Sequence, residues 1–189
     1  MNILVVNGHP DSKSYVSALF KAYVKNIDRN KNNLKVLELG KMNFDPVLRY
    51  GYRKRMNFDK EIEMSQNLIK WADHIVLFYP IWFAGPPALV WGWFERVLTP
   101  GVAYNMDGYK VKKHFHGKTA HIISTSISPV IYLRLRGNFE LKPVKDTLEF
   151  CGIKIIKVSR IGHYVVGKYE NLKKRKQFIR KISSIAKMI

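Results

Sequence analysis

The chain contains little cysteine and few acidic residues. Cys151 is the single cysteine among 189 residues, so an internal disulfide is excluded, and we expect a protein of the reducing cytoplasm. There are 14 Asp and Glu residues against 33 Lys and Arg residues, which gives a net charge of +19. Such an excess predicts attraction to acidic surfaces and phosphates, but it does not predict a fold.

Long apolar runs are also missing. No stretch approaches the ~20 apolar residues that a membrane-spanning helix needs. Met1 and Asn2 lead straight into a short apolar run, without the basic segment or cleavage site of a secretory signal. With 47% apolar and 25% charged residues, the composition is that of a globular chain, and we expect a single domain over residues 1–189.

The positive charge is spread along the chain. Residues 173–176 form a tight basic block, but zinc-finger spacings and aromatic-basic RNA signatures are missing. A generally lysine-rich surface explains the charge better than specific nucleic-acid binding, an alternative that rests on charge alone.

Short apolar runs alternate with helical patterns along the chain. Runs rich in β-branched residues are typical of strands buried on both faces of a parallel sheet. Right-handed crossovers between such strands place helices on both faces, and five units favour the flavodoxin-like strand order 2-1-3-4-5 of an α/β fold. The predicted strands are residues 3–6, 34–39, 75–79, 119–125 and 154–161, the predicted helices are about 15–27, 59–72, 86–98, 138–151 and 172–189, and the expected loops include 43–58, 99–117 and 126–137.

The chain is organised around residues 74–98. Pro80 ends a central strand because it has no N–H for the ladder, and residues 85–87, Gly-Pro-Pro, supply a turn and a helix start. The apolar residues 81–83 lie between them, at the carboxyl end of the strand, where open α/β sheets bind ligands. These side chains either form a ligand-binding shelf or only cap the core.

A polar loop follows the first strand. Residues 7–15 are rich in turn residues and hydroxyls, and Ser12 and Ser14 are candidate N-caps of the following helix. A strand, a polar loop and a helix N-terminus together make an anion site, to which Lys13 adds a donor. Ordinary helix capping explains the serines equally well, and His9 can simply bond a backbone group.

Three histidines invite a metal interpretation. His114, His116 and His121 have no acidic or cysteine partner at ligand spacing. We therefore expect no metal and interpret them as solvated loop histidines.

The last predicted helix has an apolar face and a basic face. Eight Lys and Arg residues and one Glu lie between Lys168 and Met188. Such a helix can lie on a membrane or dock on the sheet, and we favour docking. Its predicted apolar face consists of Leu172, Ile179, Ile182, Ile185, Ala186 and Ile189.

Five motifs occur in order over nearly the whole length: GHPDSKSY at 8–15, MNFDPVL at 42–48, WAD at 71–73, YPIWFAGPPA at 79–88 and GWFERV at 92–97. In these motifs the chain resembles the flavodoxin-like NAD(P)H:quinone oxidoreductases. That family includes the DT-diaphorases, short bacterial relatives and the ancillary oxidoreductases of glutathione-gated potassium efflux systems.

The resemblance implies a flavin site at the switch point between the first and third strands. The cofactor would be FMN, with FAD as the alternative. The resemblance places the flavin phosphate and ribityl chain at His9, Ser14, Tyr15 and Val16, the isoalloxazine ring at Pro80, Ile81, Trp82 and Phe83, and its polar edge at Ser124, Thr125, Ser126 and Ile127.

The resemblance also implies an activity, that of an NAD(P)H dehydrogenase (quinone). It would transfer a hydride from NAD(P)H, through the flavin, to a quinone or a similar acceptor. Tyr132 matches a family tyrosine near the flavin carbonyl and is the candidate catalytic residue. Arg134 and Arg136 are candidates for the phosphates of the dinucleotide, or are plain solvated charges.

Two further expectations concern partners. In many members of the family, the region matching residues 92–103 lies near a homodimer interface, so the resemblance implies a homodimer. The alternative function is a flavin-binding regulatory ancillary subunit of a glutathione-gated potassium efflux system, with a membrane transporter as partner.

The chain departs from the family pattern around the flavin. Ser126 and Ile127 stand where the family has two glycines, which restricts the backbone conformations open to this loop. Phe83 stands where tryptophan is common, and Gly137 or Asn138 replaces a histidine of the mammalian enzymes.

Overall fold

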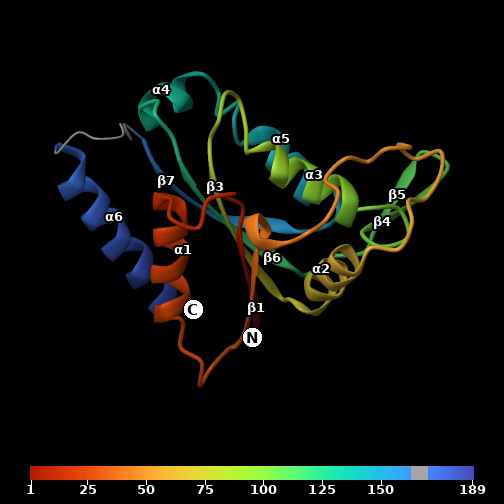
Figure 1. Ribbon diagram of the computed structural model, residues 1–189, viewed down its shortest axis with the longest axis horizontal. Helices are drawn as coiled ribbons and strands as arrows, with labels where there is room; N and C mark the ends of the chain where they lie inside the picture. The colour runs from red at the N-terminus through yellow and green to blue at the C-terminus, as the bar shows by residue number, and fades with distance from the viewer. Residues whose placement is uncertain (163–169) are drawn as a thin grey trace.

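A computed structural model describes residues 1–162 and 170–189. Its centre is a five-stranded parallel sheet in the order β2-β1-β3-β6-β7, with helices on both faces (Figure 1). This arrangement confirms the predicted flavodoxin-like fold, because these five strands follow the order 2-1-3-4-5 when numbered along the chain. The strands are β1 (Asn2–Asn7), β2 (Asn33–Glu38), β3 (His74–Pro80), β6 (Thr119–Thr125) and β7 (Lys154–Ile161).

The two faces of the sheet bury separate apolar clusters. Successive side chains of a strand point to opposite faces, so Ile3 and Val5 join one cluster while Leu4 and Val6 join the other. β3 is buried at every position, which explains its unbroken apolar sequence. One face carries α1 (Tyr15–Asn26) and α6 (Glu170–Lys187), and the other carries α2 (Lys60–Trp71), α3 (Ala88–Val97) and α5 (Lys142–Phe150) (Figure 1).

Side-chain caps determine where the first two helices begin. The hydroxyl of Ser14, not that of Ser12, accepts a hydrogen bond from the N–H of Ser17 at the start of α1. Asp59 caps α2 by accepting from the N–H groups of Glu61 and Ile62. Each cap satisfies N–H groups that have no partner inside the helix.

The C-terminal helix α6 docks on the domain beside α1. Ile182 and Ala186 are fully buried, and the Tyr15 hydroxyl donates to the Arg175 carbonyl at 3.0 Å. Leu172 is exposed, so its predicted place on the buried face is wrong, and Phe178 is buried there instead. Lys168, part of the basic pattern, lies outside the described residues. In the described parts of the chain, no helix is long and apolar enough to cross a membrane.

Two predicted loops contain regular structure. Residues 99–117 include an antiparallel hairpin of β4 (Tyr104–Asp107) and β5 (Lys110–Lys113), which projects at one end of the molecule (Figure 1). The hairpin escapes an apolar-run criterion because most of its residues are exposed. Residues 126–137 include the short helix α4 (Val130–Leu135), and residues 39–41 form the one-turn helix η1 (Leu39–Lys41). The helix predicted from 138 begins only at Lys142, because Asn138 has a φ of +55°.

Candidate functional site

Three loops meet at the carboxyl edge of the parallel sheet. The N–H of Gly8, after β1, donates to the Phe78 carbonyl at 2.7 Å. The N–H of Ile81, after β3, donates to the Thr125 carbonyl at the end of β6, also at 2.7 Å. The predicted phosphate loop, the aromatic segment and the β6 exit loop are therefore neighbours on one rim, which we call the carboxyl rim.

A hydrogen bond fixes the tautomer of His9 on this rim. The Asp11 N–H donates to His9 Nδ1 at 2.9 Å, so Nδ1 acts as acceptor and the ring proton lies on Nε2. Partial burial lowers the pKa of His9, although nearby Asp11 opposes this effect. The residue is therefore a neutral imidazole whose Nε2–H can donate to an anion.

The start of α1 offers backbone donors. The N–H groups of Tyr15 and Val16 lie in the first turn of α1, where a helix provides no acceptor. The Val16 side chain is buried in the core, and the Tyr15 hydroxyl is bonded to α6. These two predicted ligands can therefore serve an anion through their N–H groups, in the field of the helix dipole.

Two buried polar residues that the sequence analysis missed hold this loop. The Asn7 amide donates to Ser17 Oγ at 2.9 Å, and Ser17 Oγ donates to the Asp11 carbonyl at 2.9 Å. Both side chains are almost fully buried. The sequence does contain a signal for this contact, because Asn7 ends an apolar strand and a buried amide needs a hydrogen-bond partner.

The aromatic segment after β3 forms an exposed shelf. Trp82 and Gly85 exchange backbone hydrogen bonds at 2.8 and 3.2 Å, and Phe83 sits at the turn with a φ of +51°. Its side chain is fully exposed and that of Trp82 is half exposed. Only Ile81 packs against the core, so core capping does not explain Trp82 and Phe83. The Trp82 ring meets the His9 ring edge-on, with centroids 5.5 Å apart.

Backbone and side-chain groups of the β6 exit loop, where the resemblance places the polar edge of the flavin, are partly engaged within the protein. The Ser126 N–H already donates to the Ile161 carbonyl at 2.9 Å, while Ser124 and Thr125 are buried. Within the described residues the Ile127 N–H has no backbone acceptor. Neither Ser126 nor Ile127 has a positive φ, so side chains replace the family glycines without left-handed backbone.

The helix α4, which follows this loop, carries Tyr132. The ring is about half exposed, and the Arg136 guanidinium lies 5.9 Å from its centroid. Arg160, at the end of β7, holds the residues that follow α4. Arg160 donates to Asn138 Oδ1 at 2.8 Å and to Glu140 Oε1 at 2.5 Å.

Gly162 completes the support of this segment. A Cβ on Gly162 would overlap the Ser128 carbonyl and lie 2.7 Å from the Val130 nitrogen. Residues 160–162, at the end of β7 and just after it, contact residues within 126–141. We refer to residues 160–162 as the β7 clamp.

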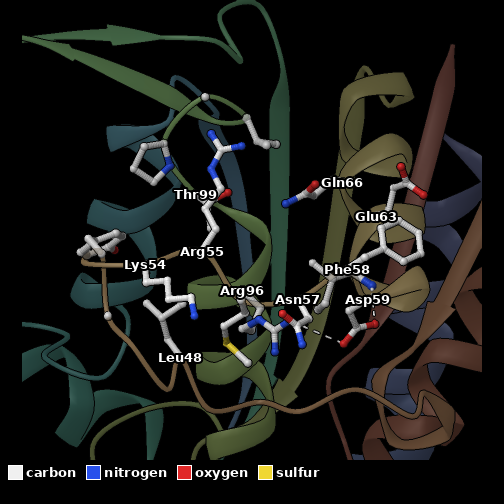
Figure 2. A pocket seen from close by; sticks show the side chains of 17 residues that line it. Leu48, Lys54, Arg55, Asn57, Phe58, Asp59, Glu63, Gln66, Arg96 and Thr99 are labelled. Atoms are coloured by element: carbon white, nitrogen blue, oxygen red, sulfur yellow. Dashed lines mark hydrogen bonds and ion pairs between the residues drawn. The ribbon is translucent and has the colours of Figure 1, made fainter.

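Two of the family motifs, residues 42–48 and 92–97, pack against each other away from the carboxyl rim. Arg96, buried in α3, donates to the Asp45 carbonyl at 2.5 Å and lies 3.6 Å from the Asp59 carboxylate. A Cβ on Gly92 would overlap Pro46. Figure 2 shows Arg96 and Asp59 at the wall of a cavity, whose volume is about 490 Å³ and whose wall includes Leu48 and residues 54–59.

His114, His116 and His121, which invited a metal interpretation, have different surroundings. Among the described residues, no group of three or more His, Cys, Asp or Glu side chains is placed to hold a metal ion. His121 is buried in β6, with Nε2 3.0 Å from Ser159 Oγ, so its interpretation as a solvated loop histidine is wrong. His114 Nδ1 lies 3.2 Å from the Val102 carbonyl.

Comparison with known proteins agrees with this geometry. The chain belongs to the family described as having a flavodoxin-like fold, whose family model matches residues 1–185. It is 28% identical over 190 residues to NAD(P)H dehydrogenase [quinone] 1 of Cavia porcellus, covering 85% of this chain and 69% of that protein. The resemblance to flavodoxin-like quinone oxidoreductases seen in the sequence is thereby confirmed.

Solved structures share the whole architecture. Smu.1420 of Streptococcus mutans superposes with a TM-score of 0.85 at 26% identity, over 100% of both chains. General stress protein 14 of Treponema denticola, solved in complex with FMN, superposes with a TM-score of 0.67 at 19% identity over 98% of both chains. The latter likeness shows the fold alone.

Proposed function

We propose that this protein is a flavin-dependent NAD(P)H dehydrogenase (quinone) whose flavin lies on the carboxyl rim. One observation supports this proposal above all. The N-terminus of α1, which can bind an anion, lies beside the exposed aromatic residues 82 and 83, and the His9 and Trp82 ring centroids are 5.5 Å apart. The NAD(P)H and quinone named for the Cavia relative support the donor and the acceptor.

The residues of the rim fit a flavin mononucleotide. The Nε2–H of His9 and the N–H groups of Tyr15 and Val16 would hold the phosphate. Trp82 and Phe83 offer exposed ring surface for the flat tricyclic system. FMN is favoured over FAD because a chain of 189 residues leaves little obvious room for an adenosine pocket, and the FMN bound to the Treponema protein supports the same choice.

The chain's own groups have definite tasks in this proposal. A bound flavin would supply the two-electron hydride chemistry. The Ile127 N–H and the Tyr132 hydroxyl would stabilise negative charge at the polar edge of the ring, as fixed donors do where charge develops. The β7 clamp would keep both groups in place, because it braces the loop and the helix that carry them.

An absorbance spectrum of the purified protein, followed by mass identification of the molecule that heat releases, tests the cofactor. We expect flavin absorption and the mass of FMN, and then NAD(P)H oxidation that depends on added quinone. A colourless protein that takes up neither FMN nor FAD would refute the proposal. Negligible turnover, together with co-purification of a potassium-efflux transporter, would replace catalysis by the regulatory alternative.

We also propose a homodimer through the outer face of α3. An apolar surface cavity of about 410 Å³ lies there, bordered by Trp91, Leu98, Tyr104 and Phe150. A second copy would cover this apolar surface. Sedimentation equilibrium should give twice the chain mass for the natural protein and one chain mass for Phe150→Glu, and a monomeric natural protein would contradict the proposal.

A further inference from the structure

A third cavity lies between α4, α5, β7 and α6. It has a volume of about 570 Å³. This volume is within the range of roughly 300–1,000 Å³ that is typical of small-molecule sites. Neither the fold nor the proposed flavin chemistry requires it.

The wall of this cavity is strongly basic. Arg134 of α4, Lys142 and Lys145 of α5 and Lys181 of α6 line it, together with one acidic residue, Asp146. Across the described parts of the chain, none of these four cations forms an ion pair. Like charges from three helices repel one another, so an anion bound between them would remove this repulsion.

The start of α5 adds to the same field. Leu141 and Lys142, at the N-terminus of this nine-residue helix, border the cavity. Leu141 provides no side-chain cap, and the first turn contains no acidic residue. Neither the N-cap nor the first turn therefore offsets the positive end of the helix dipole, and the neighbouring Glu140 carboxylate is already paired with Arg160.

The base of the cavity is rigidly built. Arg160 lines it and is already neutralised by the buried Glu140, which it contacts at 2.5 Å. The same guanidinium holds Asn138 at 2.8 Å. The cations of the wall thus lie around a base that an ion pair and a hydrogen bond hold in place. A lysine-rich surface that is merely solvated has no such concave shape.

We propose that this cavity is a separate binding site for a small phosphorylated molecule carrying two or more negative charges. Charge and concavity favour phosphate groups, because ammonium and guanidinium donors from three helices line one concave space. The site is also coupled to the carboxyl rim. Val130 and Arg134 of α4 border the cavity, while Tyr132, two residues from each, lies about 200° around the helix. An anion bound to Arg134 would therefore restrain the helix that carries Tyr132.

Titration calorimetry with inorganic pyrophosphate tests the proposal on the whole protein, at constant ionic strength near 0.15 M so that surface charges are screened. The variant Lys142→Gln/Lys145→Gln should lose affinity by about tenfold or more, because it removes two charged donors from the wall. Lys181→Gln should weaken binding from a different helix. The matched control Lys60→Gln/Lys70→Gln removes the same charge from exposed positions of α2 and should change affinity by less than about twofold.

Four outcomes would overturn the proposal. Equal losses in the cavity variant and the α2 control would mean bulk electrostatics. The absence of pyrophosphate binding in the natural protein would mean that the cavity is not an anion site. Pyrophosphate binding that vanishes when NADPH is added would assign the cavity to the dinucleotide. Sedimentation with phosphatidylglycerol vesicles that the cavity variant abolishes, without pyrophosphate binding, would assign it to a lipid headgroup. None of these tests requires turnover, so their failure is distinguishable from failure of the proposed enzymatic function.

Discussion

The guanidinium of Arg160 donates to Glu140 Oε1 at 2.5 Å, and the Glu140 carboxylate is fully buried. The pair joins β7 to Glu140, two residues before the start of α5. Removing water from two charges is costly, so such a pair tolerates the loss of both partners better than the loss of one.

This pair yields the first prediction. Arg160→Met should lower the free energy of unfolding by about 3–5 kcal/mol, because Glu140 would be left charged and unpaired in the core. The double variant Glu140→Leu/Arg160→Met should recover much of that loss. Urea unfolding followed by circular dichroism measures both, and a double variant as unstable as Arg160→Met would contradict this account.

A second prediction concerns the joint between two family motifs. Gly92→Ala should destabilise the protein by about 1–3 kcal/mol, because the added methyl overlaps Pro46 in a packed contact. Gly85→Ala is the matched control, since its nearest neighbour, Trp91, would lie at an ordinary 3.5 Å. Thermal unfolding of the two variants should separate them clearly, and equal melting temperatures would disprove the proposed overlap.

A third prediction separates stability from cofactor binding. Phe83 is exposed and has a φ of +51°, so Phe83→Gly should leave the unfolding free energy unchanged or raise it by up to about 1 kcal/mol. The same change should weaken flavin binding by about 2- to 10-fold, because an aromatic contact is lost. Fluorescence titration with FMN measures the second effect. Phe58→Gly, away from the carboxyl rim, is the control and should leave flavin affinity unaltered.

A fourth prediction tests the hydroxyl of Tyr132. Tyr132→Phe should reduce quinone-dependent turnover by about 10- to 100-fold, the order expected for loss of a donor to developing charge, while bound flavin stays at its normal level. Tyr50→Phe, at an exposed tyrosine outside the rim, serves as the control. If turnover of Tyr132→Phe matches that of the natural protein, Tyr132 has no part in the reaction.

A fifth prediction follows from two buried histidines. Burial lowers the pKa of His74 to about 4 and that of His121 to about 3, the latter helped by Lys157 and by His74 itself. Below pH 6.5 the unfolded chain binds protons that the folded chain does not, so stability falls as the pH falls. Each histidine should cost about 1.4 kcal/mol per pH unit below that point. Urea unfolding between pH 7 and pH 5 should show this slope, and His121→Gln should remove about half of it.

The strands were predictable because burial on both faces leaves a direct mark on sequence. β3 is buried at all positions, and residues 75–79 within it form an unbroken apolar run. The hairpin formed by β4 and β5 gave no such mark, since it is exposed. Its signal was Gly108, the first residue of the two-residue turn between Asp107 and Lys110, where φ is +57°.

The candidate site could be predicted only for the loops that directly follow the parallel strands. The loop after β1 and the aromatic segment after β3 had to share an edge once the strands were parallel. The β7 clamp could not be foreseen, because Arg160 meets Asn138 and Glu140 through tertiary packing that no local pattern encodes. The same limit applies to the N–H of Ser126, which is already bonded to Ile161.

The position of β1 inside the sheet has a consequence for biosynthesis. β1 lies between β2 and β3, and residue 3 pairs with residue 74, so β1 gains its second neighbour only after a segment far downstream has been made. Folding is slow when a long loop must close before stabilising contacts can form. Until β3 is available, one edge of β1 stays unpaired and exposed in the nascent chain. We expect this protein to collapse late during translation and to depend on chaperones until β3 has emerged.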